Sequence, residues 1–340
     1  MENKKVKLGQ FFTKESLWLK PQIKEFIFNS NCNIAYDPYA GAGDILTAVK
    51  NLGINNTFGL DVDSTLMWEI NDSLINIPHI EGAIIVTNPP YLSNYSASRK
   101  KIYDSVSKYF ENSIYDDVYL IALDKMLNAQ KYIVAIIPET FINSNYLQKN
   151  KLHSITVLED NPFHDTDTPV CVVCFDGNEK SFELVKIYKN DKYVCTLSDI
   201  ENNRLEPKNN IKIQFNVLDG WLGLRAVDTT SELDMLRFDF KENFDYDWEK
   251  GIKVSSRLLS VIDIKIQDID KEKYIEICNR ILNEKREITD DLIFSPFKGN
   301  MKGGRRRRRL DFRTARAIME LAYEELYGRS DKDEKQLRLF

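Results

Sequence analysis

Four consecutive residues, Asn88-Pro89-Pro90-Tyr91, combine an amide side chain, two prolines and an aromatic ring. The Asn88 side-chain carbonyl and the Pro89 backbone carbonyl could accept the two hydrogens of an exocyclic amine, whose lone pair is otherwise delocalised into its ring. They would favour a pyramidal nitrogen and stabilise the positive charge that develops when this nitrogen is alkylated. Tyr91 offers a face on which an extruded base can stack. The tetrapeptide therefore suits group transfer to an amine, although Asn-Pro-Pro is also ordinary turn chemistry.

A glycine-containing turn and two acids precede the tetrapeptide. The turn, residues 37–43 (Asp-Pro-Tyr-Ala-Gly-Ala-Gly), has small residues that let the backbone approach a ligand at a helix N-terminus. Asp61 lies 18 residues after Gly43, at the end of a strand-like run, where a carboxylate can bind a ribose diol. Asp72 follows 11 residues later, where the next strand-end loop is expected. Each acid alone is typical of a surface, but this order of turn, acids and tetrapeptide indicates a ligand site.

Strand-like and helix-like segments alternate through the first half of the chain. The expected strands are residues 34–36, 57–60, 83–86, 132–137, 151–158 and 170–175, and the expected helices are 43–52, 67–75 and 105–130. This alternation predicts an α/β fold with a doubly wound, Rossmann-like sheet of parallel strands. Ligands of such sheets bind at the carboxyl ends of the strands, and the turn, Asp61 and Asn88 all follow strands.

The alternation fades near Phe182, and a mixed, turn-rich pattern follows. We expect a catalytic domain over residues 1–185, a recognition domain of mixed α+β structure over 186–328, and a frayed tail over 329–340. An apolar stripe at helical spacing between Ala315 and Leu326 predicts a C-terminal helix that ends at Gly328.

Cysteine usage and hydropathy indicate a cytoplasmic protein. Cys171 and Cys174 have the spacing of a metal or redox pair, but they lie in an apolar strand-like run, and the chain has five cysteines and only three histidines. We expect two core thiols and no metal site. The chain has no apolar run of transmembrane length, and its N-terminus lacks the apolar segment of a signal peptide.

Together, residues 37–43, Asp61, Asp72 and 88–91 resemble the motifs of the S-adenosylmethionine-dependent amino-methyltransferases of DNA. The resemblance covers about residues 8–178. It has the gamma order, with the cofactor motifs first, then the catalytic motif, then a recognition region. It implies S-adenosylmethionine as cofactor and double-stranded DNA as partner, with Asn rather than Ser at position 88 leaning toward adenine N6 over cytosine N4. A separately encoded restriction endonuclease would be a further partner, whereas an orphan modification enzyme has none.

The resemblance also implies roles for individual residues. Residues 9–13 resemble the segment that closes over the methionine end of the cofactor, and Asn161-Pro162-Phe163 resembles the segment that carries a second stacking aromatic. The implied cofactor-binding residues are Phe11, Phe12, Thr13, Asp37, Tyr39, Ala40, Gly41, Gly43, Asp61, Asp72 and Asn88. The implied catalytic residues are Asn88, Pro89, Pro90 and Tyr91, with Tyr91 and Phe163 on either side of a flipped base.

Positive charge is concentrated near the C-terminus of an otherwise acidic chain. The net charge is −5, yet residues 296–317 contain nine Lys or Arg and one acid. Five consecutive arginines follow Gly303-Gly304, and arginine suits contacts with phosphates and base edges. We expect this run to lie on a DNA-binding face reached through flexible glycines, the alternative being a solvated loop without a role. The expected DNA contacts are Lys298, Lys302, Arg305, Arg306, Arg307, Arg308, Arg309 and Arg313.

Two other classes of function remain open from the sequence. The same tetrapeptide could act on a protein glutamine amide or an RNA base, because an amide nitrogen is delocalised in the same way. The chain could also be a non-catalytic DNA-binding protein on a methyltransferase scaffold. Phe163 and the basic C-terminal region favour DNA, and intact Asn88, Tyr91 and Asp61 favour catalysis.

Overall fold

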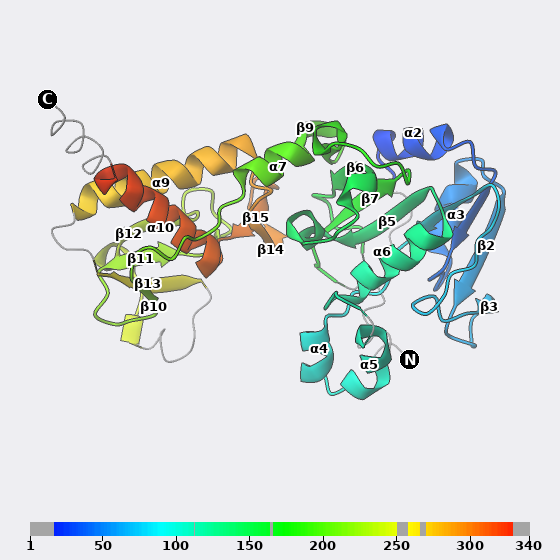
Figure 1. Ribbon diagram of the computed structural model, residues 1–340, viewed down its shortest axis with the longest axis horizontal. Coiled ribbons are helices and arrows are strands. Elements are labelled where there is room, and N and C mark those ends of the chain that lie inside the picture. Colours follow the sequence, from blue (N-terminus) through cyan, green and yellow to red (C-terminus); the bar gives the residue numbers. More distant parts are fainter. Residues whose placement is uncertain (1–16, 112, 164–165, 250–257, 266–269, 329–340) are drawn as a thin grey trace, which may run out of the picture. The chain divides into compact units, whose positions relative to one another are not determined.

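The computed structural model describes residues 17–111, 113–163, 166–249, 258–265 and 270–328 (Figure 1). The chain divides into two compact units, residues 1–198 and 199–340. The predicted cofactor residues Phe11, Phe12 and Thr13 lie outside the described residues, as does the tail expected over 329–340.

The first unit contains a nine-stranded sheet in the order β3-β2-β1-β4-β5-β7-β6-β8-β9. Its strands are β1 (Ile34–Asp37), β2 (Asn56–Asp61), β3 (Glu69–Ile70), β4 (Ala83–Thr87), β5 (Ile133–Pro138), β6 (Leu152–Val157), β7 (Val170–Phe175), β8 (Lys186–Lys189) and β9 (Lys192–Thr196). Strands β1 to β5 pair in parallel and in doubly wound order, with the reversal between β1 and β4. The predicted α/β, Rossmann-like fold is confirmed.

The sheet is not parallel throughout. Strand β7 runs antiparallel to both β5 and β6, and β9 runs antiparallel to β8. The described part of the link between β6 and β7 has no helix, so these strands pair directly as antiparallel neighbours rather than through a helical crossover. Cys171 and Cys174 are buried and free within β7, as predicted for core thiols.

In the described part of the first unit, the α-helices are α2 (Pro21–Asn29), α3 (Asp44–Asn51), α4 (Asn94–Arg99), α5 (Tyr103–Phe110) and α6 (Val118–Ala129), and α7 (Leu197–Asn203) spans the boundary. Two helix predictions are wrong. Residues 67–75 contain the short β3 and turns, and residues 105–130 form two helices rather than one. The break before α6 is held by backbone pairing, because the N–H of Val118 donates to the carbonyl of Leu92.

The first unit extends further along the chain than residue 185. Strands β8 and β9 belong to its sheet, and Ile187 and Cys195 on these strands are buried. The compact unit therefore ends at residue 198, because its sheet is complete only after β9.

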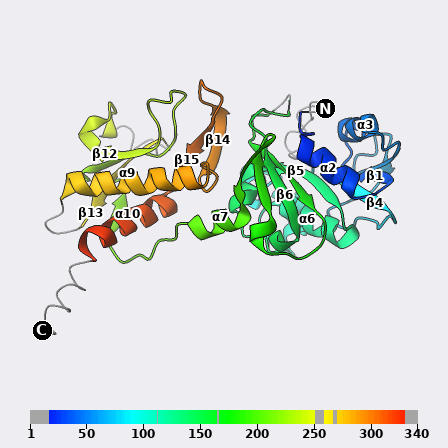
Figure 2. The same cartoon turned by 90° about the horizontal axis from the view of Figure 1, so that it is seen from above.

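The described part of the second unit contains a four-stranded antiparallel sheet, a two-stranded hairpin and two long helices. The sheet strands are β10 (Ile213–Phe215), β11 (Leu222–Arg225), β12 (Arg237–Phe240) and β13 (Leu259–Ile264), and the hairpin pairs β14 (Ser295–Asn300) with β15 (Arg306–Arg309). Helices α9 (Lys271–Ile288) and α10 (Phe312–Tyr327) lie side by side (Figures 1 and 2). The predicted C-terminal helix is confirmed in α10. No helix in the described ranges is long and apolar enough to cross a membrane.

Candidate active site

One pocket in the first unit lies at the carboxyl ends of β1, β2 and β4. It is lined by Asp37, Pro38, Tyr39, Ala40, Gly41, Ala42, Asp44, Ile45, Asp61, Val62, Asp63, Leu66, Asn71, Asp72, Ser73, Leu74, Asn88, Pro90 and Tyr109. The structure thus brings together seven of the predicted cofactor residues, namely Asp37, Tyr39, Ala40, Gly41, Asp61, Asp72 and Asn88. Gly43 does not line the pocket, although its chain neighbours Ala42 and Asp44 do.

The glycine turn is shaped by a residue that the sequence did not reveal, Trp68. Gly41 and Gly43 both have positive φ, 53° and 88°, which is strained for other residues. The indole N–H of Trp68 donates to the carbonyl of Gly41 at 2.8 Å. A Cβ on Gly43 would lie 2.8 Å from the Trp68 ring, and a Cβ on Gly59 would lie 2.5 Å from it. Gly43 therefore serves the shape of the turn and the packing of Trp68.

Asp61 connects the end of β2 to this turn. Its carboxylate is buried, with Oδ2 accepting the N–H of Gly41 at 2.9 Å and Oδ1 accepting the N–H of Asp63 at 2.9 Å. Each carboxylate oxygen can accept a further hydrogen bond. Asp61 can therefore hold the turn and still accept a hydroxyl from a ligand, and its ribose contact stays a prediction.

Asp72 is held in the pocket by helix α5. Its Oδ2 accepts the Lys108 ammonium and the Tyr109 hydroxyl, each at 2.9 Å. Burial raises the pKa of Tyr109, and the Asp72 contact adds to this effect. Tyr109 is a pocket residue that sequence reasoning missed, since it lies 37 residues from Asp72 and only tertiary packing brings it there.

Asp37 is a buried carboxyl whose described donors are uncharged. Its Oδ1 accepts the Thr87 hydroxyl at 2.5 Å and the N–H of Tyr39 at 2.9 Å. Burial raises the pKa of Asp37 to about 7; the two hydrogen bonds oppose this shift, and the nearby Asp61 charge adds to it. A cation placed in the pocket would favour the ionised form of this carboxyl.

The described lining of the pocket is strongly acidic. It contains five aspartates, Asp37, Asp44, Asp61, Asp63 and Asp72, and no lysine or arginine. Such a lining repels phosphate groups and attracts a cationic ligand, even though the turn leads into the N-terminus of α3. Val62, Leu66 and Leu74 add apolar surface to the same pocket. The pocket therefore suits a positively charged ligand with hydroxyls and an apolar ring.

The tetrapeptide follows β4 directly, with Asn88 and Pro90 lining the pocket. The Tyr91 hydroxyl donates to Asn88 Oδ1 at 2.5 Å and lies 2.8 Å from the carbonyl oxygen of Ile136. Burial raises the pKa of Tyr91 well above its usual value, so this hydroxyl stays neutral. Tyr91 therefore fixes the orientation of the Asn88 side-chain carbonyl.

The second predicted stacking residue, Phe163, lies against Tyr91. The ring centroids are 6.2 Å apart with an interplanar angle of 69°, an edge-to-face contact, and Phe163 is 1% exposed. The two rings are not parallel plates, so a base can stack on both only if one ring rotates. Their stacking roles stay predictions.

Four of the five consecutive arginines form strand β15, Arg306–Arg309. Strand alternation buries Arg306 and Arg308, which are 5% and 1% exposed, so the expectation that these two contact DNA is corrected. The turn before them is ordered by backbone bonds, including Met301 N–H to the Arg305 carbonyl at 2.8 Å. The outer residues of the predicted set remain accessible: Lys298 and Lys302 are exposed, Arg305, Arg307 and Arg309 are half-buried, and Arg313 pairs with Glu206 at the surface.

No protein-family model and no curated protein matches the chain. Among solved structures, a Listeria monocytogenes protein described as a class I S-adenosylmethionine-dependent methyltransferase aligns with 13% identity over 53% of this chain and 66% of its own, at a TM-score of 0.38. A Vibrio vulnificus protein described as a modification subunit of a type I restriction enzyme aligns with 16% identity over 53% of this chain and 47% of its own, at a TM-score of 0.39. A Streptococcus thermophilus type I restriction-modification methyltransferase subunit aligns with 18% identity over 56% of this chain and 52% of its own, at a TM-score of 0.39.

The chain thus spans between about half and two thirds of the lengths of these three proteins. Similarities at such low TM-scores carry no argument about activity. The functional assignment therefore depends on the geometry of the pocket and the tetrapeptide.

Proposed function

We propose that the protein is an S-adenosylmethionine-dependent DNA methyltransferase that modifies the N6 amine of an adenine flipped out of the duplex. The observation that carries this proposal is the single acidic pocket in which the glycine turn, Asp61 and Asp72 meet Asn88. A cofactor in this pocket would lie next to the tetrapeptide whose carbonyls can bind an amine. The biological setting would be a restriction-modification system or an orphan modification enzyme.

The residues of the pocket fit S-adenosylmethionine better than a dinucleotide. The cofactor has a sulfonium and an ammonium group, which the acidic lining would attract, and no phosphate, which that lining would repel. Asp61 would accept the ribose hydroxyls, and Val62, Leu66 and Leu74 would pack on the adenine ring. When bound, the cofactor supplies an electrophilic methyl group on a positively charged sulfur.

The tetrapeptide would act on the target amine through fixed acceptors. Asn88 Oδ1 and the Pro89 carbonyl would bind the two amine hydrogens and stabilise the positive charge that develops on nitrogen. A carbonyl oxygen has two lone pairs, so Asn88 Oδ1 can accept the Tyr91 hydroxyl and an amine hydrogen at the same time. No strong base is needed in this step.

The test is methylation-sensitive sequencing of DNA from cells that express the protein, with an Asn88→Ala variant as control. We expect N6-methyladenine at a defined site for the native protein and a loss of roughly 100-fold or more in transfer rate for the variant. Cofactor affinity should be nearly unchanged in the variant, because the Asn88 contacts matter most in the transition state. Parallel losses of affinity and rate would mark Asn88 as structural.

The same experiment separates the remaining alternatives. Methyl transfer to a protein glutamine or to RNA, with unmodified DNA, would replace DNA as the substrate. Binding of DNA without binding of S-adenosylmethionine would support the alternative that the chain is a non-catalytic DNA-binding protein.

A further inference from the structure

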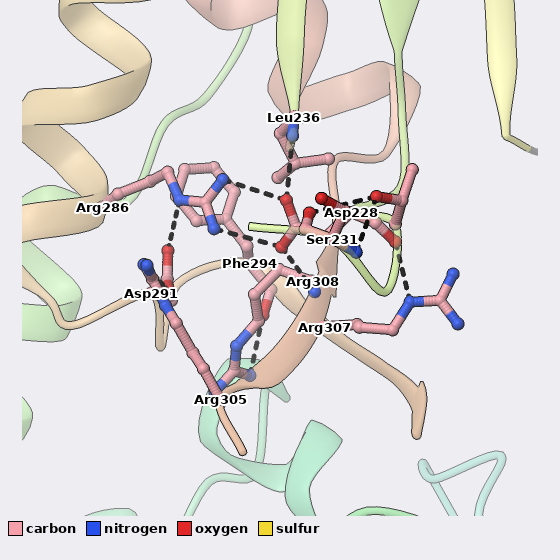
Figure 3. A network of polar contacts seen from close by, with 10 residues as sticks. Asp228, Ser231, Leu236, Arg286, Asp291, Phe294, Arg305, Arg307 and Arg308 are labelled. Atoms are coloured by element: carbon pink, nitrogen blue, oxygen red, sulfur yellow. Dashed lines mark hydrogen bonds and ion pairs between the residues drawn. The ribbon is translucent and has the colours of Figure 1, made fainter. Parts of the chain in front are cut away.

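Strand β15 separates the arginine run into two sets with different surroundings. Figure 3 shows Arg305, Arg307 and the buried Arg308 beside Arg286, in a network around the carboxylates of Asp228 and Asp291. Asp228 and Asp291 are fully buried, and Arg286 of α9 is 5% exposed. This network holds β15 in place within the second unit.

Asp228 is the centre of the network. Its two carboxylate oxygens accept Arg286 Nη1 and Nη2 in a fork, each at 3.1 Å. The same carboxylate accepts the N–H of Leu236 at 2.8 Å and the N–H of Arg308 at 2.9 Å. The backbone carbonyl of Asp228 accepts Arg307 Nε at 2.8 Å. One residue therefore sets the position of the strand and of the Arg307 side chain.

Asp291 neutralises a second group of arginines. It accepts Arg286 Nε at 2.6 Å and Arg305 Nε at 2.9 Å. Burial alone would raise the pKa of Asp291, but the charges of Arg286 and Arg305 hold it below its usual value. The charge of Arg305 is therefore largely committed to Asp291.

Arg307 differs from these residues because its guanidinium is fixed without a carboxylate among its described contacts. Its Cζ lies 4.9 Å from the centroid of the Phe297 ring, and its Nε is bound by the Asp228 carbonyl. Figure 3 shows the two terminal nitrogens pointing away from the network. Its Nη1 donates to the Lys298 carbonyl at 3.5 Å, a long contact at an exposed residue that a base edge can replace. The side chain thus keeps its charge and its terminal donors for a ligand, and little rotamer entropy remains to be lost on binding.

Resting on the DNA methyltransferase function proposed above, we propose that Arg307 is a specificity-determining residue that binds the major-groove edge of a guanine in the recognition site. A two-stranded ribbon such as β14–β15 fits the major groove, and the terminal nitrogens of a fixed arginine match the O6 and N7 acceptors of guanine. Lys298 and Lys302, exposed on the same hairpin, supply attraction to the phosphate backbone. The buried network then explains why the ribbon is rigid enough to select a base.

The test compares charge with geometry at position 307. Full-length native protein, Arg307→Lys and Lys302→Ser are used to select bound duplexes from a library of randomised DNA. We expect Arg307→Lys to reduce the preference for guanine at one position by roughly 10-fold or more. The slope of log affinity against log salt should stay the same, because the positive charge is kept. Lys302→Ser should keep the sequence preference and reduce that slope by about 0.9.

A Phe297→Leu variant provides a second measurement that leaves the buried network intact. It should weaken the guanine preference without changing the salt slope, because it removes only the ring that orients Arg307. Native sequence preference in both Arg307→Lys and Phe297→Leu would overturn the proposal, whatever the salt slope. Failure of the native protein to bind or methylate any duplex would instead overturn the proposed function. If the native protein methylated DNA and both variants kept its sequence preference, only the role of Arg307 would be ruled out, and the proposed function would stand.

Discussion

The two units of the chain bury carboxylates in opposite ways. In the first unit, Asp37 meets a hydroxyl and a backbone N–H, and burial raises its pKa to about 7. In the second unit, Asp228 and Asp291 meet the guanidinium of Arg286, and the pKa of Asp291 is lowered despite its burial. A buried carboxyl that lines a pocket and has no cation beside it indicates a site for a cationic ligand. A buried carboxyl that is paired with an arginine indicates a structural role.

The largest effect is expected from a substitution that disrupts the buried network of Asp228, Asp291 and Arg286. Asp228→Asn should destabilise the second unit by about 3–5 kcal/mol, because Arg286 would stay buried after losing one of its two charge partners. Hydrogen exchange resolved by peptide would show faster exchange in α9 and β15, with the first unit unchanged.

A matched control for this change is Asp234→Asn. Asp234 pairs with Arg225 and Arg237, but its side chain is 35% exposed, so its loss should cost no more than about 1 kcal/mol. Equal effects of the two variants would show that the buried network does not stabilise the second unit more than a surface pair does.

A smaller effect is expected from removing an acid of the ligand pocket. Asp61→Ala should weaken S-adenosylmethionine binding by about 1–3 kcal/mol, since the proposed charged acceptor for the ribose and the bond to the N–H of Gly41 are both lost. Asp61→Asn keeps one carbonyl acceptor and should lose less. Calorimetric titration measures both, and unchanged affinity in the Ala variant would remove Asp61 from the site.

The sequence predicted those parts of the site that depend on strand ends. The glycine turn begins at the end of β1, Asp61 is the last residue of β2, and Asn88 follows β4, so a parallel sheet brings them to one edge. Trp68 and Tyr109 could not be predicted, because tertiary packing brings Trp68 to the glycine turn and Tyr109 to Asp72. Their local sequence has no pattern that points to the glycine turn or to Asp72.

The second unit shows the limit of a charge pattern. Five identical arginines have no hydropathy alternation, so the sequence could not show that two of them face inward in β15. Arg308 meets the buried carboxylates of Asp228 and Asp291, which lie 80 and 17 residues from it in the chain. The expectation that all five arginines lie on a DNA-binding face omitted these partners.

The most subtle expected difference between the units is their response to pH. The folded pKa of Asp37, about 7, lies above its ordinary value of 3.8, so its contribution to stability is present below the ordinary value and lost as pH rises through about 7. The folded pKa of Asp291 is lowered, so its contribution is present above its ordinary value and lost as pH falls through the folded value. Hydrogen exchange measured across pH should therefore show opposite trends in the two units.

Cofactor binding should depend on the same titration. A sulfonium ligand favours ionised Asp37, so affinity for S-adenosylmethionine should rise by up to about tenfold per pH unit below about pH 7 and level off above it. Calorimetry in buffers of different ionisation enthalpy would detect the proton released on binding. Asp37→Asn cannot titrate, and it should bind more weakly with affinity independent of pH in this range. If the affinity of the folded native protein did not change with pH, Asp37 would already be ionised in the free protein. The proposed difference between Asp37 and the arginine-paired carboxylates of the second unit would then be wrong.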